Sequence, residues 1–245
     1  MTQIPWLSPL NNIFPSPRLA LQEPNGLLAA GGDLSPERIL AAYRQGIFPW
    51  FNPDDPILWW SPSPRTVIFP KELHISKSLR KTLRNGTYRV TFDHCFKGVM
   101  RACAEPRSYT DGTWISEDII VGYSELHKRG HAHSVEVWKA DELVGGLYGM
   151  ALGQVFFGES MFSRADDASK VGFAHLVRQL VAWDFQLIDC QVANDHLFSL
   201  GAVEIARDEF QQLLLNFTNK KPNYPANWSE LTNDSGTLTQ RGYYD

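Results

Sequence analysis

The stretch HSVEVWKADELVGGLYGMALGQVFFGESMF at positions 133–162 decides the fold. It contains three strand-like runs, His133–Lys139, Glu142–Met150 and Gln154–Phe162, separated by two short turns. Runs rich in Val, Tyr and Phe that are joined by tight turns predict an antiparallel meander. We therefore expect a mostly antiparallel sheet at the centre of the molecule.

Downstream of this stretch the pattern changes to helices around one further strand. Apolar residues at helical spacing predict a helix over Ala168–Trp183, followed by a strand over Leu187–Ala193. Two more helices are expected at His196–Leu200 and Arg207–Asn216. Meander, helix, strand and helix in this order resemble the acyl-transferring half of the N-acetyltransferase-like (GNAT-like) fold, an analogy that does not establish function.

Upstream of the meander the sequence predicts a strand over Tyr88–Phe92 and helices over Phe96–Ala104 and Glu117–Arg129. Residues 1–65 are rich in proline and tryptophan. They hold one expected helix, from Pro36 to Gln45, and aromatic segments that are too interrupted by proline for a regular element. We expect an α+β (mixed α/β) chain. Its parts are a small N-terminal α/β domain (1–65), a GNAT-like domain (66–230) and an irregular tail (231–245).

The composition excludes several classes of protein. The chain has 245 residues with a net charge of −4, 43% hydrophobic and 20% charged residues, which is typical of a globular protein. No apolar run approaches the 18 residues of a membrane span, and the N-terminus has no signal-peptide pattern. Three cysteines without a CxxC spacing argue against a disulfide framework and a zinc module, so we expect a cytoplasmic protein.

One basic segment stands against the acidic average. The segment from Lys71 to Arg89 contains six Lys or Arg and one acidic residue, which gives a local charge of 6 − 1 = +5. Four of these residues have the spacing i, i+3, i+4 and i+7, which places them on one helical face. They are Lys77, Arg80, Lys81 and Arg84. Such a stripe is either a solvated helix face or a contact for the phosphates of a nucleic acid.

Three polar residues interrupt otherwise apolar strands. Asp189 and Gln191 share one face of the strand 187–193, and Glu159 has apolar neighbours in the last run of the meander. Burying them without partners would cost about 1–3 kcal/mol each. We expect Asp189 to accept a hydrogen bond from the Gln191 amide, and Glu159 to have a raised pKa or a cationic partner. The alternative for each is an edge position that faces water.

Other candidates are weaker. His131 and His133 could ligate a metal, but no third ligand is indicated, so we predict no metal site. Cys190 is expected to be a small core residue rather than a nucleophile. The pair Gly145 and Gly146 within a strand suggests a bulge or a close backbone approach to a ligand.

Eight short motifs together resemble the bacterial leucyl/phenylalanyl-tRNA–protein transferases. They run in register from about Phe14 to about Gln212 and are EPNGLLA (23–29), GGDLSP (31–36), GIFPWF (46–51), LWWSP (58–62), GTWI (112–115), GHAHSVEVW (130–138), GESMFS (158–163) and IDCQV (188–192). The resemblance implies an enzyme that takes Leu, Phe or, less readily, Met from aminoacyl-tRNA. It would join that residue to the α-amine of proteins that begin with Arg or Lys, which creates an N-terminal degradation signal.

The resemblance also implies roles for single residues, without a cofactor and with a monomer expected. Asp189, Gln191 and Glu159 match the catalytic centre of the family, and Trp50 and Trp114 match the residues that hold the 3′-terminal adenosine. The pocket for the transferred side chain matches Leu147, Phe173, Leu176 and Ile188. The stripe on 77–84 falls where the family binds the acceptor stem of the tRNA.

Chemistry alone leaves other readings open. An aminoacyl ester is already activated, so the site has to bring amine and ester together, accept a proton and stabilise an oxyanion. An acetyl-CoA-dependent N-acetyltransferase is one rival, although the junction SRADDASK (163–170) lacks glycine and carries two acids. A non-catalytic tRNA-binding module is another, but it leaves Asp189, Gln191 and Glu159 without a task.

Overall fold

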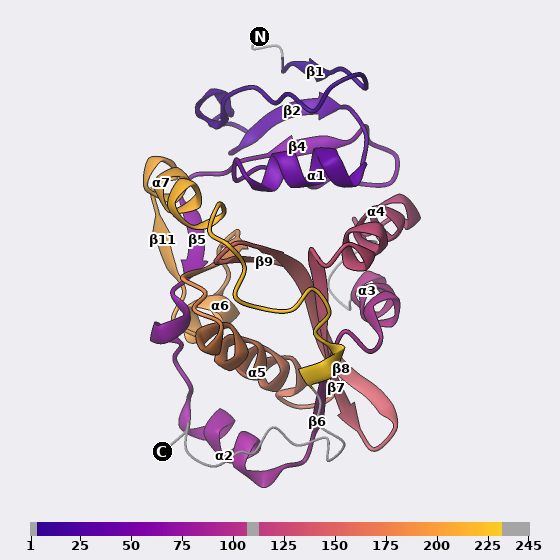
Figure 1. The fold of residues 1–245 in the computed structure, drawn as a ribbon, viewed down its shortest axis with the longest axis vertical. Coiled ribbons are helices and arrows are strands. Elements are labelled where there is room, and N and C mark those ends of the chain that lie inside the picture. The colour runs from indigo at the N-terminus through magenta and orange to yellow at the C-terminus, as the bar shows by residue number, and fades with distance from the viewer. Residues whose placement is uncertain (1–3, 107–112, 232–245) are drawn as a thin grey trace.

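The computed structural model describes residues 4–106 and 113–231, which form two sheets flanked by helices (Figure 1). The smaller, N-terminal sheet has the order β1-β2-β4-β3, in which β1 and β2 are parallel and the other pairs antiparallel. Its strands are β1 (Trp6–Leu7), β2 (Leu27–Gly31), β3 (Phe48–Pro49) and β4 (Leu58–Trp60). Helix α1 (Pro36–Tyr43) lies between this sheet and the rest of the molecule, as Figure 1 shows.

The prediction that the aromatic segments form no regular element was wrong. Phe48–Pro49 pairs with Trp59 and Trp60 as an antiparallel ladder. Strand β3 lies at the edge of its sheet, where a proline is tolerated because one side of the strand needs no hydrogen-bond donors. The chain leaves this sheet after Trp60 and enters the next at Arg65, and the domain boundary at 65/66 stays a prediction.

The larger, central sheet has the order β11-β5-β10-β9-β8-β7-β6 among the described strands. Its bounds are β5 (Arg65–Ile68), β6 (Arg89–Phe92), β7 (Ala132–Lys139), β8 (Glu142–Leu152), β9 (Val155–Ser163), β10 (Leu187–Gln191) and β11 (Val203–Ile205). Neighbouring strands are antiparallel except for β9 and β10, which are parallel. The predicted meander β7-β8-β9 and the α+β class with a mostly antiparallel sheet are confirmed.

Helices cover both faces of the central sheet. Their bounds are α2 (Lys77–Asn85), α3 (Phe96–Ala104), α4 (Glu117–Lys128), α5 (Ala168–Ala182), α6 (Asp195–Ser199) and α7 (Arg207–Phe217), with 3₁₀ turns at Pro17–Leu19, Pro70–Glu72 and Ser229–Leu231. Helix α5 lies on one face, and α3 and α4 lie on the other (Figure 1). Two apolar cores result: the first joins α1, α3, α4 and α7 to both sheets, and the second joins α2 and α5 to the central sheet.

The pairing of β9 with β10 ends where the three flagged polar residues begin. Phe157 is the last residue of β9 that pairs with β10, opposite Asp189, although β9 continues to Ser163. In the ladder with β8, Tyr148 faces Ser160 and Gly149 faces Gly158, so Glu159 is the extra residue of a bulge. Strand β10 stops at Gln191 rather than Ala193, because Gln191 has a left-handed backbone with φ of 63°. The two strands therefore separate at these residues.

The segment after α7 returns to the sheet and is anchored by Trp228. This side chain is fully buried and stacks on His133 with 3.7 Å between ring centroids. Its backbone N–H donates to Asp93 at 2.9 Å. The predicted tail lies outside the described residues from position 232 onward. Among the helices that the structure describes, none combines the length and apolarity needed to cross a bilayer.

Candidate active site

Asp189 is held by a buried ion pair. Its two carboxylate oxygens accept from Nε and Nη2 of Arg65 at 2.8 and 2.6 Å, and both side chains are at most 1% exposed. The guanidinium carbon lies 4.8 Å from the ring centre of Phe48 and 4.7 Å from that of Phe210. Strand β3, strand β5 and helix α7 thus meet at this carboxylate. A bidentate, stacked arginine fixes both the charge and the orientation of Asp189.

The expected bond between Asp189 and the amide of Gln191 is not formed. Instead, Oδ1 of Asp189 accepts from the backbone N–H of Gln191 at 2.9 Å. The expectation assumed regular alternation, but the ladder with β5 slips between these two residues and Gln191 turns left-handed. A left-handed backbone costs a residue other than glycine about 1–2 kcal/mol. The bond from its N–H to the fixed carboxylate offsets part of that cost.

Glu159 is half-buried and joins Gln191 to two tyrosines of the first core. Its Oε1 accepts from the Tyr43 hydroxyl at 2.6 Å and from Nε2 of Gln191 at 3.2 Å, and its Oε2 accepts from the Tyr123 hydroxyl at 3.1 Å. Burial raises the pKa of Glu159 to about 7, although the hydrogen bonds from the two phenols and the charge of Arg65 lower it. The raised pKa agrees with the expectation from the sequence.

The structure separates the three polar residues from the proposed side-chain pocket. Leu147, Phe173, Leu176 and Ile188 all lie in the second core, between the central sheet and α5, and each is at most 4% exposed. Arg65 and the tyrosines that contact the polar residues touch the first core, on the other side of the sheet. The two groups come closest in sequence at Ile188 and Asp189, where β10 leaves β9.

The two candidate tryptophans lie on the side of the first core. Trp50 follows β3 and is 49% exposed, with its ring edge-on to Trp60 at 5.6 Å. Its carbonyl accepts from the indole N–H of Trp60 at 2.6 Å. Trp114 is half-buried just before α4 and packs on the same core. Neither tryptophan hydrogen-bonds to Glu159 or Gln191 among the described residues.

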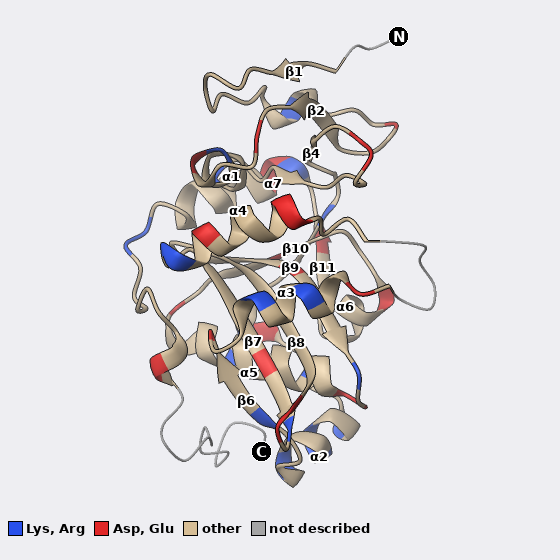
Figure 2. Cartoon of the chain, turned by 90° about the vertical axis from the view of Figure 1, so that its right-hand side faces the viewer, with Lys and Arg blue, Asp and Glu red and all other residues tan. Residues whose placement is uncertain are grey.

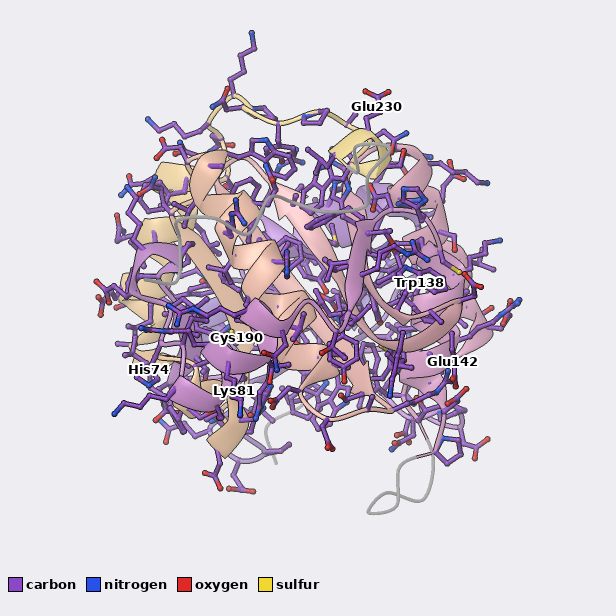
Figure 3. All side chains as sticks on the ribbon, turned by 90° about the horizontal axis from the view of Figure 1, so that it is seen from below. His74, Lys81, Trp138, Glu142, Cys190 and Glu230 are labelled. Atoms are coloured by element: carbon purple, nitrogen blue, oxygen red, sulfur yellow. The ribbon has the colours of Figure 1, made fainter. Side chains whose placement is uncertain are left out.

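Helix α2 carries the basic stripe at the end of the molecule farthest from the N-terminal sheet (Figure 2). Ser76 caps its first turn by accepting from the N–H of Leu79, and Leu79 and Leu83 are buried against the second core. The stripe faces away from that core: Lys77, Lys81 and Arg84 are exposed, and Arg80 is half-buried. Viewed from this end, Lys81 lies in the same half as His74 and Cys190, apart from Trp138 and Glu142 (Figure 3).

His133, Cys190 and Gly145 each have surroundings that suit a structural role. His133 is buried, with its Nδ1 2.8 Å from Asp93, and the described residues contain no cluster of three metal-ligating side chains. Burial raises the pKa of the Cys190 thiol far above its usual value, which argues against a nucleophile. The glycine pair directly follows a bulge at Val144, and a Cβ at Gly145 would meet Ala168 of α5 at 2.7 Å, so the close approach is to a helix rather than a ligand.

Sequence reasoning missed Arg65, Tyr43 and Tyr123. A signal for Arg65 existed, because an arginine that opens the apolar run TVIF needs an acidic partner if the run is buried. The two tyrosines carried no signal, since aromatic residues at helical spacing are typical of any core.

Known proteins match this chain over most of its length. The family profile described as leucyl/phenylalanyl-tRNA protein transferase matches residues 67–215, and that of its N-terminal domain matches residues 32–63. The leucyl/phenylalanyl-tRNA--protein transferase of Cellvibrio japonicus (strain Ueda107) is 70% identical over 93% of this chain and 97% of its own. The protein of the same name from Pseudomonas syringae pv. syringae (strain B728a) is 61% identical over 91% of this chain and 97% of its own.

One solved structure is a much more distant match. L-PGS from Bacillus licheniformis aligns with 65% of this chain and 51% of its own, with 11% identity and a TM-score of 0.37. That similarity is too low to support an argument about the site.

Proposed function

The chain belongs to the leucyl/phenylalanyl-tRNA–protein transferase family and is an aminoacyltransferase, and on this premise we propose its substrates and the task of each site residue. The donors are Leu-tRNA, Phe-tRNA and, less readily, Met-tRNA. The acceptor is the α-amine of a protein that begins with Arg or Lys. The new N-terminal residue then serves as a degradation signal in the cytoplasm.

The contact between Gln191 and Glu159 is the observation that carries this proposal. A carboxamide and a carboxylate are 3.2 Å apart at the point where β9 and β10 separate. The Gln191 amide donates to Glu159, and among the described residues its carbonyl oxygen accepts no hydrogen bond. That oxygen is available to the attacking amine. An amide is too weak a base to remove the proton itself, so Gln191 orients the amine rather than deprotonating it.

The tRNA would be held at three places. Trp50 and Trp114 present aromatic surface for the terminal adenine, which stacks on such side chains with about 1–3 kcal/mol per base. Leu147, Phe173, Leu176 and Ile188 offer an apolar environment for the transferred side chain, which has to displace part of their closed packing. The stripe on α2 contacts phosphates of the acceptor stem, so it contributes affinity but reads no sequence.

The two rival functions fit the structure less well. An acetyl-CoA enzyme would bind a diphosphate at the first turn of α5, where Asp166 and Asp167 stand instead. Their carboxylates would repel it. A module that only binds RNA would not account for a buried Arg65–Asp189 pair that fixes the strained backbone of Gln191.

A transfer assay tests the proposal. Purified protein is mixed with radiolabelled Phe-tRNA and one of two peptides that differ only in an N-terminal Arg or Ala, without ATP and without acetyl-CoA. We expect label on the Arg peptide alone. Binding of tRNA without transfer would overturn the enzymatic proposal, and equal transfer to both peptides would overturn the acceptor specificity.

A further inference from the structure

Glu159 and two tyrosines, which come from three different elements, lie in mutual contact. Tyr43 ends α1, Tyr123 lies in the middle of α4, and Glu159 is the bulge residue of β9. The two phenol oxygens are 2.6 Å apart. Tyr43 lies 2.6 Å from Oε1 and Tyr123 lies 3.1 Å from Oε2 of the carboxyl group. The three groups therefore form a closed ring of oxygen–oxygen contacts.

Counting hydrogens shows that this ring has one vacant proton position. Each of the three contacts needs one hydrogen, and each phenol supplies one. With Glu159 ionised, the two phenols supply two hydrogens for three contacts, so one contact in the ring has no hydrogen. With Glu159 protonated, three hydrogens fill three contacts and every oxygen in the ring is bonded. Both charge states are thus hydrogen-bonded, and they differ by a single proton.

We propose that Glu159 accepts the proton that the acceptor's N-terminal ammonium loses, and that Tyr43 and Tyr123 are positioning residues that hold Glu159 ready to take it. The inference rests on the proposed function. It assigns the proton acceptor of the reaction to a ring that includes Tyr43, which belongs to the N-terminal part of the chain.

The reaction balances with this assignment. The ammonium gives one proton to Glu159, and the neutral nitrogen forms a bond to the carbonyl carbon of the aminoacyl ester. The bond between that carbon and the ribose oxygen breaks, and the leaving oxygen takes the second proton of the nitrogen. The proton on Glu159 then passes to water. Gln191, whose amide contacts Oε1 of Glu159, lies where it can orient the nitrogen next to that oxygen.

The surroundings of Glu159 favour a group that titrates near neutral pH. Burial is the largest influence on its pKa and raises it to about 7, close to the usual value of 7.7–8.0 for an N-terminal amine. The charged groups that face it are Asp189, which raises the pKa, and Arg65, which lowers it, and these two form a neutral pair. The third phenol nearby, Tyr148 on β8, has a buried hydroxyl that finds no hydrogen-bond partner within residues 4–106 and 113–231. Burial keeps all three phenols protonated by raising their pKa well above its usual value.

The decisive variant is Glu159→Gln, which imitates the protonated acid. The oxygen of its carboxamide can accept from Tyr43 and from Gln191, and its nitrogen can donate to Tyr123, so the ring closes and the fold is kept, but the carboxamide cannot take a proton. At pH 7 we expect at least a tenfold loss in kcat with an Arg peptide. The loss should shrink as the pH rises past about 8, where the peptide amine is already neutral.

A second nucleophile separates proton transfer from binding. An Arg peptide whose N-terminal nitrogen is an aminooxy group is neutral at pH 7 and needs no proton acceptor. We expect Glu159→Gln to transfer Phe to this peptide within a few-fold of the wild-type rate. If Glu159→Gln instead raises KM for both peptides and leaves kcat and its pH profile unchanged, Glu159 only binds the acceptor and the proposal is wrong.

The tyrosines are tested one hydroxyl at a time. Tyr43→Phe and Tyr123→Phe each remove a donor to the carboxylate, and a bond to a charged group is stronger than one to a neutral group. The pH of half-maximal kcat should therefore rise by about one unit in each variant. Tyr148→Phe is the matched control, since its hydroxyl bonds to nothing among the described residues, and it should leave the profile unchanged. Profiles of Tyr43→Phe and Tyr123→Phe that coincide with that of the wild type would overturn the ring.

The outcome for the wild-type protein distinguishes the two levels of the argument. Transfer by the wild type to the Arg peptide and to its aminooxy analogue, together with the expected kcat losses and pH shifts of the variants, supports the ring and the proposed function together. Transfer by the wild type without that pattern overturns the ring alone. No transfer by the wild type to either peptide overturns the proposed function, and the ring's role falls with it.

Discussion

Replacing Arg65 by Leu isolates the contribution of the buried ion pair. The change removes the guanidinium that donates to both oxygens of Asp189 and leaves a carboxylate with 0% exposure and one remaining donor, the N–H of Gln191. Breaking a buried pair in this way costs about 3–5 kcal/mol of unfolding free energy. Since 1 kcal/mol shifts Tm by about 2–4 °C in a chain of this size, Tm should fall by roughly 6–20 °C.

The assay is thermal and urea unfolding followed by circular dichroism, with a second substitution as its control. The double variant Arg65→Leu, Asp189→Leu removes both charges and should recover most of the lost stability, because an apolar pair of similar volume can replace a buried ion pair at little cost. We expect no transfer of Phe by the double variant, because the N–H of Gln191 has lost its acceptor and the left-handed backbone of Gln191 is no longer held.

A loss of less than about 1 kcal/mol in Arg65→Leu would refute this reasoning, because that is the range of a solvent-exposed pair. Equal destabilisation of the single and the double variant would refute it as well. Either result would mean that Asp189 is not left as an uncompensated buried charge when Arg65 is removed.

Three further predictions follow from the structure. The pKa of Glu159 is raised from 4.5 to about 7 in the folded chain, so between these pH values the folded state holds a proton that the unfolded state has lost. The free energy of unfolding should therefore fall by about 3 kcal/mol as the pH rises through that window. Urea unfolding at pH 4.5 and 8 should show this fall in the wild type and not in Glu159→Gln. Trp228→Ala should lose about 3–5 kcal/mol, because the indole is fully buried, whereas Trp6→Ala, at 71% exposure, should stay within about 0.5 kcal/mol; equal losses would contradict the anchoring of the C-terminal segment. If the stripe on α2 binds phosphates, the logarithm of tRNA affinity should fall against the logarithm of salt concentration with a slope of about −3 to −4, and Lys81→Ala should reduce that slope by about one; an unchanged slope in a filter-binding assay would argue against the stripe.

The long elements were predictable because their patterns are strong and local. Helix α3 begins and ends at the predicted residues, Phe96 and Ala104, and the meander was predicted to within a few residues. Strands β5 and β11 were missed because Arg65–Ile68 and Val203–Ile205 are too short to show alternation, and both faces of β5 are buried. Their pairing depends on the central sheet rather than on their own residues.

The three polar residues of the candidate site could be singled out from the sequence, but their hydrogen bonds and partners could not. Asp189, Gln191 and Glu159 were conspicuous as polar residues in apolar strands, a property of the sequence alone. Their hydrogen bonds depend on a register slip in β10 and a bulge in β9, and neither leaves a mark in the sequence. The partners Arg65 and Tyr43 are more than a hundred residues away from the carboxylates that they hold.

The stack of Phe48, Arg65 and Phe210 has a consequence for the order in which the protein is made. Its members come from β3, β5 and α7, so it closes only when α7, near the end of the chain, has left the ribosome. The N-terminal sheet, whose strands all precede Arg65, can form earlier, since folding during synthesis proceeds from the N-terminus. Asp189 stays without its final packing until then. Synthesis therefore completes the packing around the candidate site last, and a chain interrupted before α7 would already hold Glu159, Asp189 and Gln191 without the stack that fixes Arg65.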